Sequence, residues 1–339
     1  MSAPLAPQAG ATPDAAAYER LRTDAGCFDR SSRLRMTFVG AKAGETITGL
    51  VTSDVMALQP GHGQYAAALT PKGKVIADLR VFHRAPGDYL VDVPASAAAG
   101  FTAMIRKYVN PRLATYTDVS ASLRCLSVAG PHARQVVAHA LGCSPSDFDL
   151  LPPFAHHSPS FGDDPVMVAR SADYGVDGFD CFVRAEFAPA LHAALVAAGA
   201  PPADEAALEV LRVEAGRPAW GADMNEETLA QEASLDALGA ISYTKGCYTG
   251  QETVARVHFH GHVNRVLRGV RADAMPAGET LLFAGDKEVG DVRSRAVSPR
   301  LGAIALAMVR REVDAGSVVT MRWADGEASA TVVDLPFPA

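Results

Sequence analysis

From Val266 onward the sequence contains only short β-rich segments separated by glycine and proline, and this pattern constrains the fold more than any other feature. Apolar and β-branched residues gather in runs such as Ile304–Val309, and Pro276 and Gly316 mark turns between such runs. Many short strands with regular turn residues are typical of a small barrel or sandwich. We therefore expect an all-β barrel over residues 261–339.

The rest of the chain alternates strand and helix patterns. Lys74–Phe82 is apolar and β-branched, whereas Phe101, Met104 and Ile105 recur at helical spacing. This mixture predicts an α+β region, which we place at residues 14–260.

Three structural units follow from these patterns. A second cycle of strands and helices runs over roughly residues 121–200, so the α+β region divides into two subdomains, and the barrel is the third unit. Residues 1–13 are rich in Ala and Pro, and we expect them to form a mobile tail. The length of 339 residues fits two or three domains.

Composition and charge narrow the class of protein. With 48% hydrophobic and 20% charged residues, the chain has the composition of an ordinary globular protein, and its formal net charge of -7 argues against a chain-wide nucleic-acid surface. Its longest apolar stretches are far shorter than the roughly 20 residues that a membrane helix needs. The first residues lack the basic start and apolar core of a signal peptide, and the five cysteines are scattered, as is usual for reduced thiols. We therefore expect a cytoplasmic protein with no membrane segment.

The densest chemical signal is the segment Lys245–Glu252, which reads Lys-Gly-Cys-Tyr-Thr-Gly-Gln-Glu. Gly246 and Gly250 allow the backbone to turn sharply, which would present Cys247 on an exposed loop. The ammonium of Lys245 would then favour the thiolate. The alternative is a small buried cysteine in a glycine-rich turn, and no order of Cys, His and Asn indicates a protease.

This segment closely resembles the corresponding segment of YgfZ-type folate-binding proteins, which are relatives of the glycine-cleavage aminomethyltransferase, or T-protein. Further motifs extend the resemblance over most of the chain. They are Gly49–Val55, Thr70–Lys74, Tyr174–Asp180, Leu211–Gly216, Gly261–Arg265 and, at the end of the barrel, Leu335–Phe337.

The resemblance implies an aminomethyltransferase-like ring of three subdomains around tetrahydrofolate, with the C-terminal strands as the third subdomain. Glu214 matches the family's pterin-binding glutamate, and a carboxylate there would accept two parallel N–H bonds from the pterin edge. The expected cofactor-binding residues are therefore Glu214, Arg212, Tyr174, Asp177 and Asp180. Without the resemblance, Glu214 is interpreted as a surface carboxylate beside Arg212, and Tyr174–Asp180 as a hairpin turn.

One motif departs from the family. In the aminomethyltransferases, the strand after the glycine-rich turn carries two adjacent acids near the reactive folate nitrogen, whereas this chain has Ala77 followed by Asp78. Asp78 remains a candidate for proton transfer and for stabilising an iminium cation, or it pairs locally on its strand. The missing carboxylate weakens the expectation of an enzyme.

A run of histidines, His258-Phe259-His260-Gly261-His262, is the second conspicuous feature. On a strand, all three imidazoles would lie on one face and could converge on zinc or iron, with a solvated strand face as the alternative. Arg256, Arg265, Arg268 and Arg271 make the same stretch basic. These arginines would bind the glutamate tail of folate or an RNA phosphate, and the absence of an aromatic ladder favours the carboxylates.

Our leading expectation is a tetrahydrofolate-binding accessory protein that supports the assembly or repair of iron-sulfur enzymes, as the resemblance to the YgfZ type implies. Its partners would be folate and iron-sulfur client or assembly proteins. Cys247 would be the reactive thiol and Lys245 its electrostatic neighbour, and any cluster would be shared with a partner because four thiolates usually hold one. The alternatives are a folate-dependent aminomethyltransferase that uses Asp78, and a metalloprotein organised by the histidine run.

Overall fold

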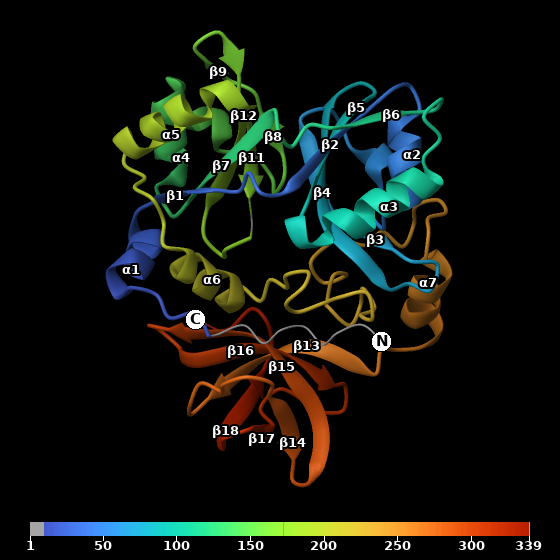
Figure 1. Ribbon diagram of the computed structural model, residues 1–339, viewed down its shortest axis with the longest axis vertical. Helices are drawn as coiled ribbons and strands as arrows, with labels where there is room; N and C mark the ends of the chain where they lie inside the picture. The colour runs from blue at the N-terminus through green and yellow to red at the C-terminus, as the bar shows by residue number, and fades with distance from the viewer. Residues whose placement is uncertain (1–9, 172, 339) are drawn as a thin grey trace.

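The computed structural model describes residues 10–171 and 173–338, and it arranges them in three parts around a shared centre (Figure 1). Two lobes, each built from one sheet and its helices, lie side by side, one in blue to cyan and the other in green. The C-terminal barrel, in orange and red, lies beneath both lobes. This arrangement confirms the expected α+β fold with three subdomains and a C-terminal β-barrel.

The first lobe contains a five-stranded antiparallel sheet with the order β3-β4-β5-β2-β6. Its elements are β2 (Leu34–Val39), α2 (Ala43–Leu50), η1 (Val55–Ala57), β3 (His62–Leu69), β4 (Val75–Ala85), β5 (Asp88–Val93), η2 (Ala95–Ala97), α3 (Ala98–Tyr108) and β6 (Thr115–Asp118). β3 and β4 pair as the hairpin expected around residues 70–73. Gly73 in this turn has a φ of 75°, a conformation that glycine adopts without strain.

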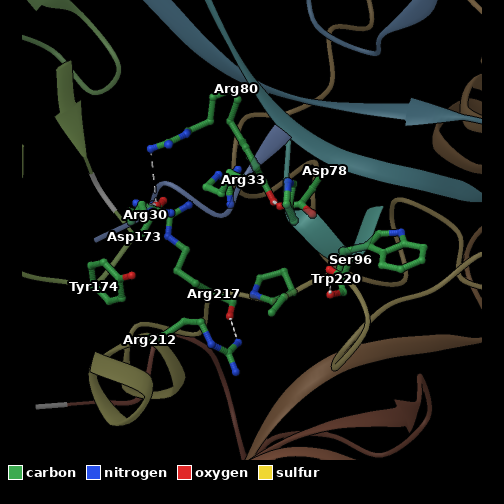
Figure 2. A pocket seen from close by; sticks show the side chains of 14 residues that line it. Arg30, Arg33, Asp78, Arg80, Ser96, Asp173, Tyr174, Arg212, Arg217 and Trp220 are labelled. Atoms are coloured by element: carbon green, nitrogen blue, oxygen red, sulfur yellow. Dashed lines mark hydrogen bonds and ion pairs between the residues drawn. The ribbon is translucent and has the colours of Figure 1, made fainter. Parts of the chain in front are cut away.

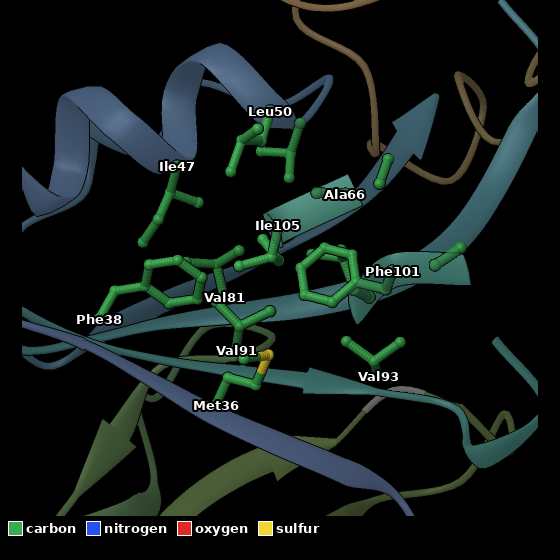
Figure 3. Packing of buried hydrophobic residues seen from close by; sticks show 14 of the residues in the cluster. Met36, Phe38, Ile47, Leu50, Ala66, Val81, Val91, Val93, Phe101 and Ile105 are labelled. Carbon is green, nitrogen blue, oxygen red and sulfur yellow. The ribbon is translucent and has the colours of Figure 1, made fainter. Parts of the chain in front are cut away.

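The two faces of this sheet differ because successive strand residues point in opposite directions. On β4, Ala77 and Leu79 belong to the core cluster that also contains Phe101 of α3. Figure 3 shows Phe101 among other members of this cluster. Asp78 and Arg80 therefore lie on the opposite face, which is directed toward the second lobe. The apolar face holds α2 and α3, while the other face carries charged side chains into the centre of the molecule.

The second lobe contains another five-stranded sheet, with the order β1-β7-β12-β11-β8. Its elements are β1 (Gly26–Asp29), β7 (Leu123–Ala129), α4 (Ala133–Leu141), η3 (Pro145–Phe148), β8 (His156–His157), β9 (Ser160–Phe161), β10 (Asp164–Pro165), β11 (Met167–Ser171), β12 (Gly178–Arg184), η4 (Ala185–Phe187) and α5 (Ala188–Ala197). β1 precedes the first lobe in the sequence and forms the edge of this sheet, so the chain crosses from the second lobe to the first at residues 30–33.

The sheets of the two lobes face each other. Phe82 of β4 and Phe182 of β12 contact edge to face, with ring centroids 5.5 Å apart. Cys125 and Met167 belong to the same buried cluster. The helices cover the outer faces of both sheets, so the inner faces are left to form the seam between the lobes.

The C-terminal strands close into a barrel with the order β13-β16-β15-β14-β17-β18. They are β13 (Arg265–Ala272), β14 (Leu281–Ala284), β15 (Lys287–Ser298), β16 (Gly302–Arg310), β17 (Val318–Trp323) and β18 (Gly326–Val333). Closure pairs every strand and leaves no open sheet edge.

Two helices join the barrel to the lobes. α1 (Ala15–Thr23) contributes Tyr18 and α6 (Glu205–Glu214) contributes Leu211 to a cluster that also contains Met308 of β16. Ala11 forms a parallel bridge to Ala296 of β15, so residues 10 and 11 of the expected mobile tail are held against the barrel. Residues 1–9 of that tail lie outside the described residues.

His258 and His260 lie in a helix, so the strand arrangement considered for a metal site does not occur. α7 (Gln251–His260) begins after Gly250 and ends before Gly261. Residues two positions apart on a helix point to nearly opposite sides, so His258 and His260 do not share a face. Across residues 10–171 and 173–338, no helix is both long and apolar enough to cross a membrane.

Candidate functional site

A cavity of about 220 Å³, named the central cavity below, lies between the two lobes and the segment that follows α6 (Figure 2). It is lined from β4, from the crossing segment after β1, from the loop after β11 and from residues 217–220. The lining residues whose side chains could bind a ligand or take part in a reaction are Arg30, Arg33, Tyr65, Asp78, Tyr174 and Trp220.

Asp78 is the carboxylate of the central cavity with an unused oxygen. The phenol of Tyr65 donates a hydrogen bond to Oδ2 of Asp78 at 3.0 Å. Oδ1 is buried and has no hydrogen-bond partner in the described part of the chain. Burial raises the pKa of Asp78, while Arg33 and the hydrogen bond from Tyr65 act in the opposite direction. A buried carboxylate with a raised pKa and a free lone pair is suited to accept a proton or to face a developing positive charge.

Three aromatic rings give the central cavity flat apolar surfaces. Tyr65, Tyr174 and Trp220 all line it. Tyr65 is fixed by stacking on Phe154, with ring centroids 6.3 Å apart. Nε1 of Trp220 is buried and, among the described residues, has no acceptor. These rings and the unpaired polar atoms fit a flat, polar heterocycle better than a flexible aliphatic molecule.

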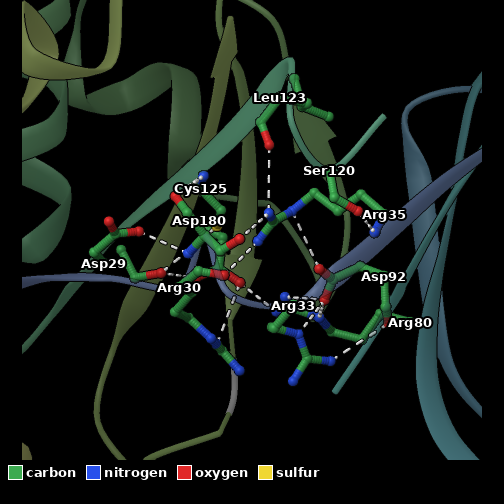
Figure 4. A network of polar contacts seen from close by, with 12 residues as sticks. Asp29, Arg30, Arg33, Arg35, Arg80, Asp92, Ser120, Leu123, Cys125 and Asp180 are labelled. Carbon is green, nitrogen blue, oxygen red and sulfur yellow. Dashed lines mark hydrogen bonds and ion pairs between the residues drawn. The ribbon is translucent and has the colours of Figure 1, made fainter. Parts of the chain in front are cut away.

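A buried network of arginines and aspartates supports the cavity wall (Figure 4). Arg80 of the first lobe pairs with Asp92 at 2.6 Å and also with Asp180 of the second lobe. Arg30 reaches Asp173 at 2.8 Å, and Arg33 reaches Asp92 at 2.6 Å.

The network also fixes the charge state of its members. Burial alone would raise the pKa of Asp92, but Arg33, Arg80 and Arg35 hold it well below its ordinary value. The charges therefore join the two lobes and keep Arg30 and Arg33 in place at the cavity.

A second cavity of about 370 Å³, named the outer cavity below, adjoins the first and shares Tyr174 and Arg217 with it. It lies where α1, α6 and the barrel meet, and Glu214 is among its lining residues. The sequence predicts that Glu214 lies at a helix end and faces a cleft. In the structure it is the last residue of α6 and lines the outer cavity.

The contacts of Glu214 give it a structural role, and its expected role as a pterin anchor stays a prediction. Its carboxylate is 5% exposed and accepts hydrogen bonds from the hydroxyls of Tyr18 at 2.8 Å and Ser298 at 2.5 Å. Arg22 and Arg300 approach Oε2 at 3.7 and 3.6 Å. Tyr18 and Ser298 both donate to Oε1, and the Tyr18 hydroxyl also lies 3.1 Å from Oε2, so Glu214 links α1, α6 and the barrel.

Of the other expected cofactor-binding residues, two line a cavity and two do not. Tyr174 lines both cavities, and Arg212 lines the central cavity while pairing with Glu209 and Asp223. Asp180 lies behind the wall, held by Arg80, Arg30 and Ser127. Asp177 lines neither cavity, and it pairs with Arg134 and Arg170 on the second lobe.

Cys247 and Lys245 lie apart from the central cavity. Cys247 is exposed, whereas Lys245 is buried. The ammonium of Lys245 donates to the carbonyls of Thr48, Val51 and Ser53 at 2.5, 2.6 and 3.0 Å, which closes the end of α2. Burial lowers the pKa of Lys245 to about 8. Its hydrogen bonds bind the glycine-rich loop to the first lobe.

Ala77 lies in the core of the first lobe and not at the central cavity. Its side chain is fully buried in the first core and points away from the central cavity. A carboxylate at this position would lie among apolar side chains and would not join Asp78 at the site. The argument from Ala77 against an enzyme is therefore wrong.

Several residues of the site were not predicted from the sequence. Arg80 follows Asp78 by two positions on one strand, so the period of two already placed both on one face. Arg30 and Arg33 come from the crossing segment and Trp220 from the segment after α6, and the spacing along the chain contains no signal that connects the two segments.

The two lobes, the barrel and the enclosed cavity define a ring-shaped small-molecule-binding protein of three subdomains. Residues 11–242 match the family described as the GCVT N-terminal domain, and residues 265–338 match the glycine cleavage T-protein C-terminal barrel domain. The chain therefore belongs to the glycine cleavage T-protein family.

Similar proteins agree with this family assignment. An aminomethyltransferase of Cupriavidus necator is 33% identical, with 94% of this chain and 88% of the relative covered, and one of Saccharopolyspora erythraea is 30% identical, with 96% and 90% covered. The solved structure of the glycine cleavage system aminomethyltransferase T from Bartonella henselae has the same fold, with a TM-score of 0.85, 24% identity, and 95% and 89% of the two chains covered.

These comparisons overturn the leading functional expectation. Relatives that align over nearly the whole chain are named aminomethyltransferases. An accessory role in iron-sulfur enzyme assembly is therefore wrong as the main interpretation, and the aminomethyltransferase alternative is favoured. The metal-site alternative loses its geometric basis because the histidine run is helical.

Proposed function

We propose that this protein is a tetrahydrofolate-dependent aminomethyltransferase with its active site in the central cavity. The observation that carries the proposal is Asp78, a buried carboxylate that Tyr65 holds by one oxygen while the other has no partner among the described residues. The kinship with aminomethyltransferases supports the same reaction class.

The residues of the central cavity fit tetrahydrofolate. The pyrimidine half of a tetrahydropterin is flat and carries several N–H donors, and the cavity offers the rings of Tyr65, Tyr174 and Trp220 together with Oδ1 of Asp78. When bound, tetrahydrofolate would supply the nitrogen atoms that accept the one-carbon unit.

Asp78 has the chemistry that removal of an amine requires. In its ionised form the carboxylate would stabilise positive charge near the reacting carbon, and its Oδ1 would accept a proton as that charge is lost. Its raised pKa brings proton exchange closer to neutral pH than an exposed aspartate would allow. The hydrogen bond from Tyr65 keeps the carboxylate in one orientation. The arginine and aspartate network holds the neighbouring side chains of the cavity wall in place.

The Lys245–Glu252 segment contributes no residue to the central cavity. The narrower placement of this chain among YgfZ-type members depends chiefly on that segment, and it remains a prediction from sequence.

The test is turnover by purified protein with tetrahydrofolate and an aminomethyl-loaded carrier protein, measured as ammonia released and methylene-tetrahydrofolate formed. Asp78→Asn should lower kcat by about 10²- to 10⁴-fold, the usual contribution of a general acid or base. Asp88→Asn, at the far end of the same sheet, is the matched control and should retain wild-type activity. Wild-type protein without turnover, or an Asp78→Asn variant with full activity, would overturn the proposal.

A further inference from the structure

A third cavity, of about 340 Å³ and named the junction cavity below, lies where the segment after α6, the end of α7 and the start of β13 meet. Val257, Val263 and Val266 contribute apolar side chains to its wall, and Gln231 and Asp236 contribute polar ones. The residues that line the central and the outer cavities include none of these. The junction cavity is therefore a separate site, which the proposed reaction does not use.

Two buried polar atoms beside the junction cavity have no hydrogen-bond partner among the described residues. They are Oε1 of Gln231 and the hydroxyl oxygen of Tyr243. Gln231 is 7% exposed, and its Nε2 donates to the carbonyl of Val254 at 2.8 Å, so the amide oxygen is left as an acceptor. The ring of Tyr243 is held by stacking on His258, with ring centroids 3.6 Å apart. A buried acceptor without a donor lowers stability, and an N–H group bound beside Gln231 would offset that cost.

The electrostatics of the junction cavity favour a positive charge. The carboxylate of Asp236 accepts a hydrogen bond from the backbone N–H of Ala237 at 2.9 Å, and it forms no ion pair within the part of the chain that the structure describes. α7 ends at His260, and Val257 and His258 of its last turn line the cavity. The negative end of the helix dipole therefore adjoins the carboxylate, and both attract a cation.

We propose that the junction cavity binds a small organic cation, a primary alkylammonium, as a ligand distinct from folate and from the amine donor of the reaction. An ammonium group has three N–H donors, which match the carboxylate of Asp236, Oε1 of Gln231 and the oxygen of Tyr243. The valines of the wall remove the alkyl chain from water. This inference does not depend on the proposed function.

A metal ion fits the junction cavity less well than an organic cation. The histidine run suggested a metal, and His258 and His262 do line the cavity. A protein site for zinc needs at least three protein ligands. Among the described residues, no group of three or more His, Cys, Asp or Glu side chains is arranged to hold a metal ion. A neutral imidazole accepts a hydrogen bond, so both histidines are compatible with the N–H donors of an organic cation.

The test is isothermal titration calorimetry of the full-length protein with n-butylammonium chloride, and with 1-butanol as the uncharged probe of the same length. The ammonium should bind about tenfold or more tightly than the alcohol, because the alcohol offers no charge to Asp236. Asp236→Asn should raise the Kd for n-butylammonium by about tenfold or more, while its amide oxygen still accepts from the N–H of Ala237. Tyr243→Phe should raise that Kd by about threefold, since one neutral hydrogen bond is lost.

Two control variants locate the binding site. Asp286→Asn removes an exposed carboxylate in the turn between β14 and β15 and should leave the Kd unchanged. Asp78→Asn should also leave it unchanged, because Asp78 lies in the central cavity. Equal binding of 1-butanol, no binding of n-butylammonium, or a Kd that Asp236→Asn raises no more than the two controls do overturns the junction site. Wild-type protein that binds n-butylammonium as expected but shows no turnover overturns the proposed function alone.

Discussion

Tyr65 and Asp78 form a hydrogen-bonded pair of 3.0 Å in which burial raises the pKa of both groups. The proximity of Asp78 raises the pKa of Tyr65 further, so the phenol stays protonated and remains a donor. The hydrogen bond opposes the rise at Asp78 because it stabilises the charged carboxylate. One bond therefore fixes the orientation of Asp78 and limits how basic it becomes.

Tyr65→Phe should move the acidic limb of the kcat/KM profile to higher pH. Activity that needs the Asp78 carboxylate is lost as pH falls through the pKa of Asp78. Removing the donor destabilises the charged form, raises that pKa and starts the loss at a higher pH. Tyr89→Phe, in the core on the opposite face of the sheet, is the control and should leave the limb in place. A Tyr65→Phe profile identical to wild type would disprove the coupling.

The fold could be predicted more fully than the site. Hydrophobic periodicity indicates which helix or strand a segment forms, but it does not indicate which distant segments meet. The β3–β4 hairpin and the barrel strands were readable from apolar alternation and from turn residues. The helix at His258 was not predicted because an alternating His pattern indicates a period of two, and residues 258–260 at the end of this helix are all exposed, so no buried helical face marks them. Gly250, with a φ of 87°, marks the start of that helix.

The partners of site residues were beyond the reach of the sequence. Tyr18 and Ser298 lie 196 and 84 positions from Glu214, yet both donate to its carboxylate. Arg30 and Trp220 meet at one cavity only because the lobes pack against the segment after α6. Spacing along a chain contains no information about such contacts.

Ala77→Asp should destabilise the protein without raising its activity. The side chain of Ala77 is fully buried among apolar residues, so an aspartate there would bury a charge without a partner. The free energy of unfolding should fall by about 3 to 5 kcal/mol, the cost of an uncompensated buried charge. Urea unfolding measures the loss, and Ala77→Val controls for added volume. A stable and more active Ala77→Asp variant would restore the argument that this position belongs to the site.

Glu214→Ala should lower stability more than it lowers folate affinity. The hydroxyls of Tyr18 and Ser298 lose a charged acceptor, while Arg22 and Arg300 remain partly solvated. We expect the free energy of unfolding to fall by roughly 2 to 3 kcal/mol. Glu205→Ala, in the first turn of the same helix, is the matched control. Unchanged stability together with weakened tetrahydrofolate binding would instead support Glu214 as the pterin anchor.

Cys247 should react fastest of the five cysteines with iodoacetamide. It is the exposed cysteine, whereas Cys27, Cys125 and Cys181 are buried and Cys143 is intermediate. Burial raises the pKa of Cys125 to about 12, so only about one molecule in 10⁴ carries that thiolate at pH 8. Mass spectrometry of partly labelled protein gives the order of reaction, and Cys247→Ser should remove the fastest phase.

The same labelling experiment separates access from electrostatics at Cys247. Because the ammonium of Lys245 is bound to the carbonyls of Thr48, Val51 and Ser53, we expect access alone to set the rate. Lys245→Met should therefore lower the melting temperature, since three carbonyls lose a charged donor, yet leave Cys247 the fastest-reacting thiol. Thermal unfolding and labelling are measured on the same preparation, with Lys42→Met on the exposed start of α2 as the control. If Lys245→Met slows labelling of Cys247 to the rate of Cys143, the lysine activates the thiol and the structural role assigned to it is wrong.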